Sequence, residues 1–324
     1  MSSEKTLRQL AQQRGIEFGA SLWAEALRED SNYWNTARRE FTSVTTSSAL
    51  KMGPLRPERK TYDFTNADAI VDFGNKYDMS VRGHTLVWHT QKPDWYQEWD
   101  YSGDQVEQFL RDHIHTVAGR YRGRVDTWDV VNEAVHEDGS MRESVWYEGI
   151  GPDYVEQAFE WADEVSDADL FYNDYDIPKK EAKADAVYDL LEDFLDRGVP
   201  VDGVGLQMHC IGSQPDPERV ADTIERFQEL GLKVHITELD VAYDADDAPE
   251  NPLEAQADYY RDLVSACVAA DCDSITTWGV NDGNSWVRDF YKAEERFTID
   301  PLLFDRKCDP KPAYYAVKEA LAGE

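Results

Sequence analysis

The sequence has little positive charge and no long apolar run. Its 324 residues include 33 lysines and arginines against 65 aspartates and glutamates, a formal net charge of −32. A surface this acidic repels nucleic acid and anionic membranes, and we exclude both as partners. No run of 18 apolar residues is present, so no membrane-spanning helix is expected. The N-terminal residues carry neither an apolar secretory segment nor a twin-arginine signal, which favours a cytoplasmic protein, although a trimmed secreted protein would look the same.

Cysteine is also scarce, and the histidines give no metal signature. The four cysteines have none of the spacings of a metal site: Cys210, Cys267, Cys272 and Cys308. Cys267 and Cys272 are close enough in sequence for a local bridge, but in a reducing cytosol we expect free thiols. His84 and His89 are five positions apart, which on a strand directs their side chains to opposite faces. We therefore expect no metal ion and no other cofactor.

The remaining composition is that of a folded protein. Hydrophobic residues make up 41% of the chain and aromatic residues 12%, which excludes a disordered acidic chain. Arginine (20) exceeds lysine (13), and heavy acidity with few lysines indicates adaptation to high salt, where charge repulsion is screened. The alternative is an acidic protein without such adaptation. The length fits one large barrel or two ordinary domains.

Short apolar, β-branched runs alternate with amphipathic helical patterns along the chain. We expect eight strands, at residues 16–20, 41–45, 81–87, 125–131, 168–172, 203–208, 233–237 and 274–278. Helical periodicity is clearest at residues 105–121, 179–197 and 218–230, and Gly198 and Gly231 follow the last two patterns as typical helix ends. Eight strand–helix units without a linker or repeat predict one (β/α)8 TIM barrel domain over residues 1–324.

Two of the predicted strands lead into a glutamate. Residues 127–134 place Glu133 after a buried strand, and residues 234–240 do the same for Glu238, 105 positions later. In such a barrel the carboxyl ends of the strands carry the chemistry. Two facing carboxyl groups are what cleavage of a glycosidic bond requires, one as nucleophile or base and the other as general acid.

Polar and aromatic residues lie at the ends of six consecutive predicted strands, the third to the eighth. They are His84 and Trp88, Asn132 and Glu133, Tyr172 and Asn173, Gln207 and His209, Glu238 and Asp240, and Trp278. A single glutamate after a strand is usually a solvated loop residue, and a single tryptophan is more often part of the core. The same location at six strand ends in succession favours a functional site.

These segments resemble glycoside hydrolase family 10, the endo-β-1,4-xylanases. The resemblance covers nearly the whole chain, at residues 18–20 (FGA), 82–89 (RGHTLVWH), 128–134 (WDVVNEA), 138–140 (DGS), 172–175 (YNDY), 205–209 (GLQMH), 236–240 (ITELD), 278–280 (WGV), 301–305 (PLLFD) and 311–314 (KPAY). So many motifs in order are specific for the family. The resemblance implies a barrel that hydrolyses xylan or xylo-oligosaccharides with retention of the anomeric configuration.

The resemblance also implies a role for each residue of the site. Glu133 would be the acid/base and Glu238 the nucleophile, with His209 bonded to Glu238 and Asp240 behind the imidazole. The other residues implied to line the sugar site are Lys51, His84, Trp88, Asn132 at the 2-hydroxyl of the attacked sugar, Tyr172 and Asn173 on the leaving side, Gln207 beside Glu133, and the aromatic walls Trp278 and Trp286.

The sequence departs from the family pattern in two places. After the second strand the family usually has Glu-Asn-x-Met-Lys-Trp, where this chain has SSALKM at residues 47–52, so that Lys51 remains and Met52 replaces the tryptophan. The family uses the lost glutamate and asparagine to hold the second sugar on the non-reducing side. Val287, after Trp286, stands where the family usually has arginine. We expect intact cleavage chemistry and leave the preference at the second sugar open.

Three functions fit these residues. The first is a retaining endo-1,4-β-xylanase, expected to be a monomer, with β-1,4-linked xylan or xylo-oligosaccharide as its partner. The second is a related β-glycosidase that acts on short or glucose-containing β-1,4 chains. The third is a non-catalytic barrel that only binds sugar or protein. Such proteins usually lack a catalytic carboxylate, and both Glu133 and Glu238 are present.

The net charge of −32 predicts a dependence on salt. The folded surface repels itself, and salt shortens the Debye length from roughly 10 Å at about 0.1 M to roughly 3 Å at about 1 M. The melting temperature and the activity should therefore both rise between about 0.1 M and several molar KCl. A flat or falling melting temperature over this range would contradict the adaptation to salt.

Overall fold

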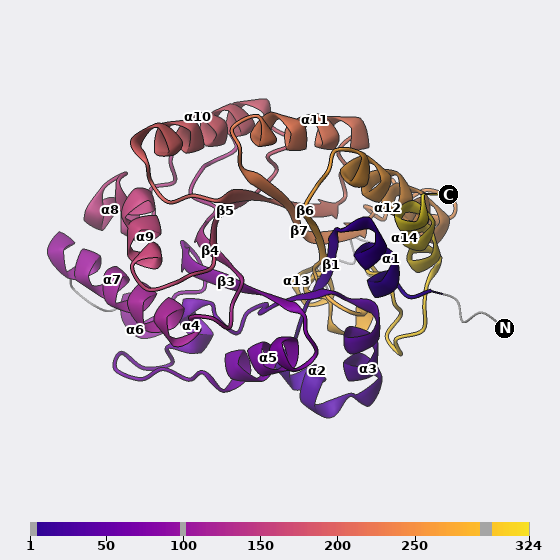
Figure 1. The fold of residues 1–324 in the computed structure, drawn as a ribbon, viewed down its shortest axis with the longest axis horizontal. Coiled ribbons are helices and arrows are strands. Elements are labelled where there is room, and N and C mark those ends of the chain that lie inside the picture. The colour runs from indigo at the N-terminus through magenta and orange to yellow at the C-terminus, as the bar shows by residue number, and fades with distance from the viewer. Residues whose placement is uncertain (1–4, 98–101, 292–299, 324) are drawn as a thin grey trace.

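Eight parallel strands close into a barrel at the centre of the molecule (Figure 1). The structure is a computed structural model that describes residues 5–97, 102–291 and 300–323. Neighbouring strands pair in sequence order, and β8 closes the ring on β1. The strands are β1 (Glu17–Ser21), β2 (Ser43–Thr45), β3 (Ser80–Trp88), β4 (Thr127–Asn132), β5 (Asp169–Tyr175), β6 (Gly203–Ile211), β7 (Lys233–Ala242) and β8 (Ser274–Thr277). The predicted (β/α)8 architecture is confirmed.

Helices accompany this barrel, and most of them surround it on its outer side (Figure 1). They are α1 (Leu7–Arg14), α2 (Ala24–Glu29), α3 (Ser31–Glu40), α4 (Met52–Leu55), α5 (Thr65–Lys76), α6 (Asp94–Gln97), α7 (Gly103–Arg120), α8 (Val145–Ile150), α9 (Tyr154–Asp163), α10 (Glu181–Arg197), α11 (Pro217–Gln228), α12 (Pro252–Ala269), the 3-10 turn η1 (Asp282–Asn284), α13 (Trp286–Tyr291) and α14 (Pro312–Ala322). The three helical patterns read from the sequence correspond to α7, α10 and α11.

Local sequence explains where the helices begin and end. Asp216 precedes α11, and its side chain accepts the free N–H of Glu218 in the first turn. Proline at the first position of that helix, Pro217, has no N–H that would need a partner. α10 ends before Gly198, whose φ of 76° lies in the left-handed region that favours glycine.

Three strands run at least three residues further at their carboxyl ends than the sequence predicted. β5 was expected to end at residue 172, β6 at 208 and β7 at 237, but they continue to Tyr175, Ile211 and Ala242. The extensions of β6 and β7 stabilise each other, because the last two residues of the two strands pair. The extension of β5 pairs instead with residues 205–207 of β6. Glu238 consequently lies within β7, whereas Glu133 follows β4 directly, as predicted.

A repeated hydrogen bond fixes the strands at the N-terminal end of the barrel. The side chain just before each even-numbered strand accepts the N–H of the second residue of the preceding strand, at 2.8 to 3.1 Å. The four pairs are Thr42 with Phe18, Asp126 with Val81, Asp202 with Leu170, and Asp273 with Val234. Because these bonds hold the strands in register at one end, the residues at the carboxyl ends come to a common rim.

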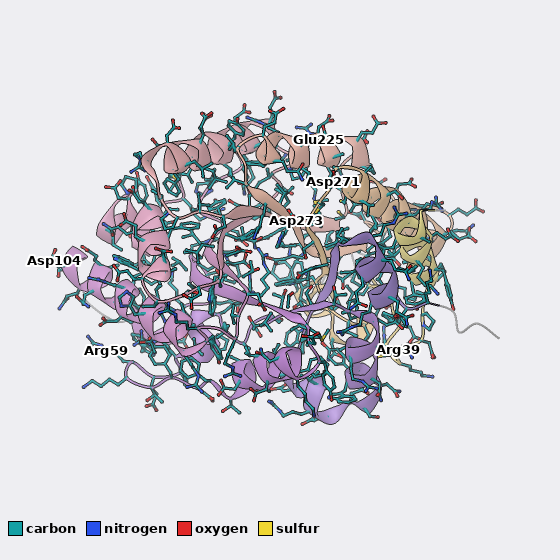
Figure 2. All side chains as sticks on the ribbon, viewed as in Figure 1. Arg39, Arg59, Asp104, Glu225, Asp271 and Asp273 are labelled. Carbon is teal, nitrogen blue, oxygen red and sulfur yellow. The ribbon has the colours of Figure 1, made fainter. Side chains whose placement is uncertain are left out.

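All four cysteines are free and buried, so Cys267 and Cys272 form no bridge. In the described part of the chain no helix has the length and apolarity needed to cross a bilayer. Within the same residues, His, Cys, Asp and Glu nowhere form a group of three or more suited to a metal ion. Charged side chains project outward from the helices, for example Asp104 on α7 and Glu225 on α11 (Figure 2).

Candidate active site

One pocket of about 530 Å³ lies at the carboxyl ends of the strands, and both predicted catalytic glutamates line it. It also brings together most of the predicted substrate contacts, namely Lys51, His84, Trp88, Asn132, Gln207, His209, Trp278 and Trp286. These residues come from the ends of β3, β4, β6 and β7 and from the segments after β2 and β8. Residues separated by more than 230 positions in the sequence therefore share one cavity, which is about the size of a small-ligand site.

Three neutral donors hold the side chain of Glu133. Trp88 Nε1 donates to Oε2 at 2.7 Å, while Asn132 Nδ2 and Gln207 Nε2 donate to Oε1 at 3.0 and 3.1 Å. The predicted contact of Gln207 with Glu133 is thus present. The backbone of Glu133 has a φ of 59°, a left-handed conformation that costs a non-glycine residue about 1 kcal/mol or more. The surrounding structure must hold this conformation, and it aims the carboxyl group into the pocket.

Glu238 has a more polar and more deeply buried environment. Asn173 Nδ2 donates to its Oε1 at 2.8 Å, and His209 Nε2 contacts its Oε2 at 3.2 Å. Burial alone would raise the pKa of this carboxyl group. Attraction to His84, the hydrogen bond from His209 and the nearby charge of Lys51 outweigh burial and lower the pKa below its usual range. Glu238 is therefore ionised at neutral pH, as a nucleophile requires.

The imidazole of His209 bridges two carboxylates. Its Nδ1 lies 3.0 Å from Asp240 Oδ1, and Trp286 Nε1 donates to Asp240 Oδ2 at 2.6 Å. Burial opposes the charged imidazole, but Asp240 and then Glu238 raise the pKa of His209 to about 10. Both ring nitrogens consequently donate at neutral pH, and the predicted arrangement of His209 between Glu238 and Asp240 is present in the structure.

A second buried charge network lies beneath the pocket. Asp129 forms an ion pair with Arg82 and accepts from His84 Nδ1 at 2.9 Å. Although burial favours the neutral acid, Arg82 and His84 lower the pKa of Asp129. Arg82 also donates to His235 Nδ1 at 2.9 Å, so that this ring nitrogen carries no proton. His235 thus belongs to the support of the site and does not line the pocket.

Aromatic rings form the walls of the pocket around the partly buried side chain of Lys51. Lys51 Nζ lies 4.4 Å from the centre of the Trp88 ring and 5.9 Å from that of Trp278. Burial lowers the pKa of Lys51, while Glu238 and Glu133 counteract this. Tryptophan rings beside polar groups suit a sugar, whose faces are apolar C–H surfaces with hydroxyl groups at the edge.

The structure corrects the prediction for Tyr172 and Asn173. Both side chains are fully buried and neither lines the pocket. Because β5 continues to Tyr175, these two residues lie inside the strand instead of at its end. Asn173 bonds to Asn132 and Glu238, and Tyr172 contacts the backbone of Ala134. They position other residues of the site.

Ser47 and Ser48, which the sequence marked as a departure from the family pattern, line the pocket, and so do residues that were not singled out from the sequence: Trp23, Thr90, Gln91, Tyr175, Asp176 and Phe290. Tyr175 occupies the true end of β5, and the motif at residues 172–175 contained it. Trp23 follows β1 by two positions, and Phe290 lies one helical turn after Trp286. An aromatic residue just after a strand end, or four positions after a known wall residue, was the available signal.

Comparison with known proteins gives consistent matches over the whole chain. Residues 6–320 match the sequence model described as glycosyl hydrolase family 10. The chain is 39% identical over 326 residues to endo-1,4-beta-xylanase B of Thermotoga neapolitana, covering 99% of this chain and 92% of that protein. Xylanase 10B from Thermotoga maritima superposes with a TM-score of 0.91 at 40% identity, covering 98% of each chain. Xylanase 10B from Thermotoga petrophila in complex with xylobiose gives a TM-score of 0.93 at 38% identity, covering 100% of this chain and 99% of that one.

The raised pKa of His209 predicts a pH-dependent contribution to stability. A histidine with a folded pKa of about 10 stabilises the fold fully below its unfolded pKa of about 6.5 and loses this contribution as the pH rises toward 10. The unfolding free energy of the wild type should therefore fall relative to that of His209→Gln between pH 7 and 10, by at most about 1.4 kcal/mol per pH unit. Urea unfolding of both proteins across this range measures the difference. Parallel curves would show that His209 is not charged in the folded protein.

Proposed function

Because the chain belongs to glycosyl hydrolase family 10, we propose that it acts as a retaining endo-1,4-β-xylanase on xylan or xylo-oligosaccharides. The observation that carries this proposal is the pair Glu133 and Glu238, which share one pocket but have opposite surroundings. One carboxyl group is held by neutral donors and the other by cationic and polar groups that keep it ionised. That difference suits an acid/base and a nucleophile.

The first step forms a glycosyl-enzyme. Glu238 attacks the anomeric carbon as the bond to the leaving oxygen breaks, and Glu133 gives its proton to that oxygen. Glu133 is then ionised and takes a proton from water in the second step, while the water oxygen replaces Glu238 at the anomeric carbon. Two displacements at the same carbon retain the configuration, and the enzyme returns to its starting protonation state.

The other pocket residues bind and orient the sugar in this proposal. Lys51 and His84 present polar groups near Glu238, and Asn132 beside Glu133 would contact the 2-hydroxyl, which contributes most in the transition state. The rings of Trp278 and Trp286 would pack on the apolar faces of the sugar. The relative from Thermotoga petrophila was solved with xylobiose, which supports a xylo-oligosaccharide as the ligand class for this chain.

One feature of the pocket favours the alternative of a glycosidase that also takes glucose-containing chains. Ser47 and Ser48 line the pocket with short side chains, and Met52 does not line it. A smaller cavity of about 100 Å³ adjoins this wall, because Trp23 and Ser48 line both. Its polar lining includes Glu25, Asp63 and Asn66. This space would accept the hydroxymethyl group that distinguishes glucose from xylose.

Substitution of each glutamate by alanine tests the assigned roles. Glu133→Ala and Glu238→Ala should each lower kcat by roughly 100-fold or more. Azide should speed turnover of an activated aryl glycoside by Glu133→Ala and give a β-azide with retained configuration, because the glycosyl-enzyme still forms. Any azide product of Glu238→Ala should be inverted, since azide then replaces the nucleophile. NMR of the products distinguishes the two, and the opposite stereochemistry would reverse the assignment.

Restoration of the family residues tests the open second sugar site. Neutral hydrogen bonds contribute about 0.5–1.5 kcal/mol and those to charged groups about 1.5–3 kcal/mol, so the two serines could forgo roughly 2–4 kcal/mol, or about 30- to 1,000-fold in affinity. Ser47→Glu with Ser48→Asn should therefore raise kcat/KM on an aryl xylobioside. The aryl xyloside, which has no second sugar, is the control and should change little.

The wild type should also prefer an aryl xylobioside over an aryl cellobioside less strongly than is usual for the family. The double substitution should increase that preference, because longer side chains fill the space that a hydroxymethyl group would need. An equal effect on the xyloside and the xylobioside, or no effect on either, would show that residues 47 and 48 lie outside the second sugar site.

A further inference from the structure

A fully buried ion pair lies behind the acid/base side of the pocket. Asp174 on β5 and Lys183 on α10 have no solvent-exposed side-chain surface, and Lys183 Nζ lies 2.8 Å from Asp174 Oδ1. Removal of two charges from water is costly, and apolar residues of similar size often stabilise a fold as well or better. Neither residue lines the pocket, so neither is a direct substrate contact. A role in positioning other groups would account for a charged pair at this place.

Asp174 is the centre of a set of hydrogen bonds that leads to the acid/base. Its Oδ2 accepts from the hydroxyl of Tyr172 at 2.6 Å. The same hydroxyl accepts the backbone N–H of Ala134 at 3.1 Å. Tyr172 and Asp174 are two positions apart on β5 and therefore point to the same side of the strand, toward α10. Lys183, Asp174 and Tyr172 thus form a continuous buried chain that ends on Ala134.

Ala134 directly follows Glu133, whose backbone is held in the left-handed region. The N–H of Glu133 donates to the carbonyl of Asn173 at 2.9 Å, and the N–H of Ala134 donates to Tyr172. Two successive peptide groups are therefore fastened to β5. Without the Tyr172 hydroxyl, one of these two anchors to β5 is lost, and the peptide group after Glu133 is held only at its carbonyl, to which Arg142 Nε donates at 3.0 Å. The carboxyl group would then leave the position in which it meets a leaving oxygen.

We propose that Lys183, Asp174 and Tyr172 are positioning residues that hold Glu133 in its acid/base geometry. This rests on the proposed function, in which Glu133 is the acid/base. Nothing in the proposal involves proton transfer through the chain. Its effect is geometric, and Tyr172 is the residue that transmits it.

The charge of Asp174 sets the direction of these hydrogen bonds. An ionised carboxylate can only accept hydrogen bonds. The Tyr172 hydroxyl must therefore donate its hydrogen bond to Asp174, which leaves an oxygen lone pair to accept the N–H of Ala134. Burial raises the pKa of Asp174 to about 6, and Lys183 is the largest influence that opposes burial. Lys183 therefore keeps Asp174 ionised at neutral pH. Replacement of the lysine by an apolar residue would let Asp174 take a proton and donate to Tyr172 itself.

The same hydrogen-bonded set, Lys183, Asp174 and Tyr172, also contacts the pocket wall on this side. The N–H of Tyr175 donates to Asp174 Oδ1 at 2.9 Å, and Lys183 Nζ lies 3.5 Å from the centre of the Tyr175 ring. Arg142 donates both to the carbonyl of Glu133 and to the hydroxyl of Tyr175, each at 3.0 Å. The nucleophile is held by other groups, Asn173 and His209. A disturbance of the chain should consequently affect the chemistry of Glu133 more than that of Glu238.

A pair of substrates distinguishes an effect on the acid/base Glu133 from an effect on the nucleophile Glu238. A 2,4-dinitrophenyl β-xylobioside has a leaving group that departs without a proton, so its kcat/KM reports the nucleophile and binding. A phenyl β-xylobioside needs help from the acid. Tyr172→Phe removes one hydroxyl group and keeps the ring. It should lower kcat/KM on the phenyl substrate by roughly 10- to 100-fold, a part of the full effect of general acid catalysis, and by a much smaller factor on the dinitrophenyl substrate.

Tyr260→Phe is the matched control. Tyr260 is also fully buried, and its hydroxyl donates to the carbonyl of Pro301 at 2.8 Å, away from the pocket. Loss of this hydroxyl removes a comparable buried hydrogen bond without touching the chain. Any loss of activity in Tyr260→Phe should be equal on both substrates. Thermal unfolding of the two variants shows whether they are destabilised to a similar degree.

Lys183→Met provides a second, independent variant and should show the same difference between the two substrates. Equal losses on both substrates in Tyr172→Phe, or in Lys183→Met if Tyr172→Phe does not fold, would overturn the proposal. The same difference in Tyr260→Phe would overturn it as well, because it would then be a general result of destabilisation. A wild type that hydrolyses neither xylobioside contradicts the proposed function and is distinguished from these outcomes before any variant is measured.

Discussion

The hydrogen bonding between parallel strands around the closed barrel is the constraint on which the site depends. It requires every strand to run in the same direction, so all eight carboxyl ends meet at one rim. At the opposite end, Asp126, Asp202 and Asp273 each fix one strand against its neighbour through a backbone N–H. Local shifts in register then occur near the rim, for example between Gln207 and His209. The strands thus keep a regular register at the N-terminal end, and the shifts near the rim change the direction in which side chains of the site point.

The same scaffold gives two chemically identical side chains different properties. Glu133 and Glu238 both have left-handed backbones at the rim, with φ of 59° and 58°. What separates them is the side chains that reach each carboxyl group. β6 brings Gln207 toward one and His209 toward the other, although only one residue lies between the two in the sequence. Residues two positions apart on a strand share a face, so it is their different heights along β6 that divide a neutral and a cationic partner between the acid/base and the nucleophile.

The sequence predicted the architecture and both glutamates, and its errors have a common physical cause. Strand identity follows from apolar, β-branched runs, but the length of a strand depends on whether its neighbour continues beside it. Residues 173–175 continue β5 because they pair with residues 205–207 of β6, so Tyr172 lies inside the strand and Tyr175 at its end. Trp23 and Phe290 were missed because only tertiary structure brings the segments after β1 and β8 to the same pocket. The sequence predicts to which side of a strand a side chain points, but it does not predict how far along the barrel axis that side chain lies.

Electrostatics act on this protein at two length scales that salt affects differently. The surplus of acidic groups over the surface exerts a long-range repulsion on any carboxylate in the pocket, and this term decreases within a Debye length. The groups that keep Glu238 ionised are instead local: His209 is in hydrogen-bond contact, and Lys51 lies between the rings of Trp88 and Trp278. Screening is weak over such distances inside a protein. High salt therefore weakens the repulsion from the surface and leaves the local attraction in place. The nucleophile consequently remains charged under conditions in which the charges of the acidic exterior are screened.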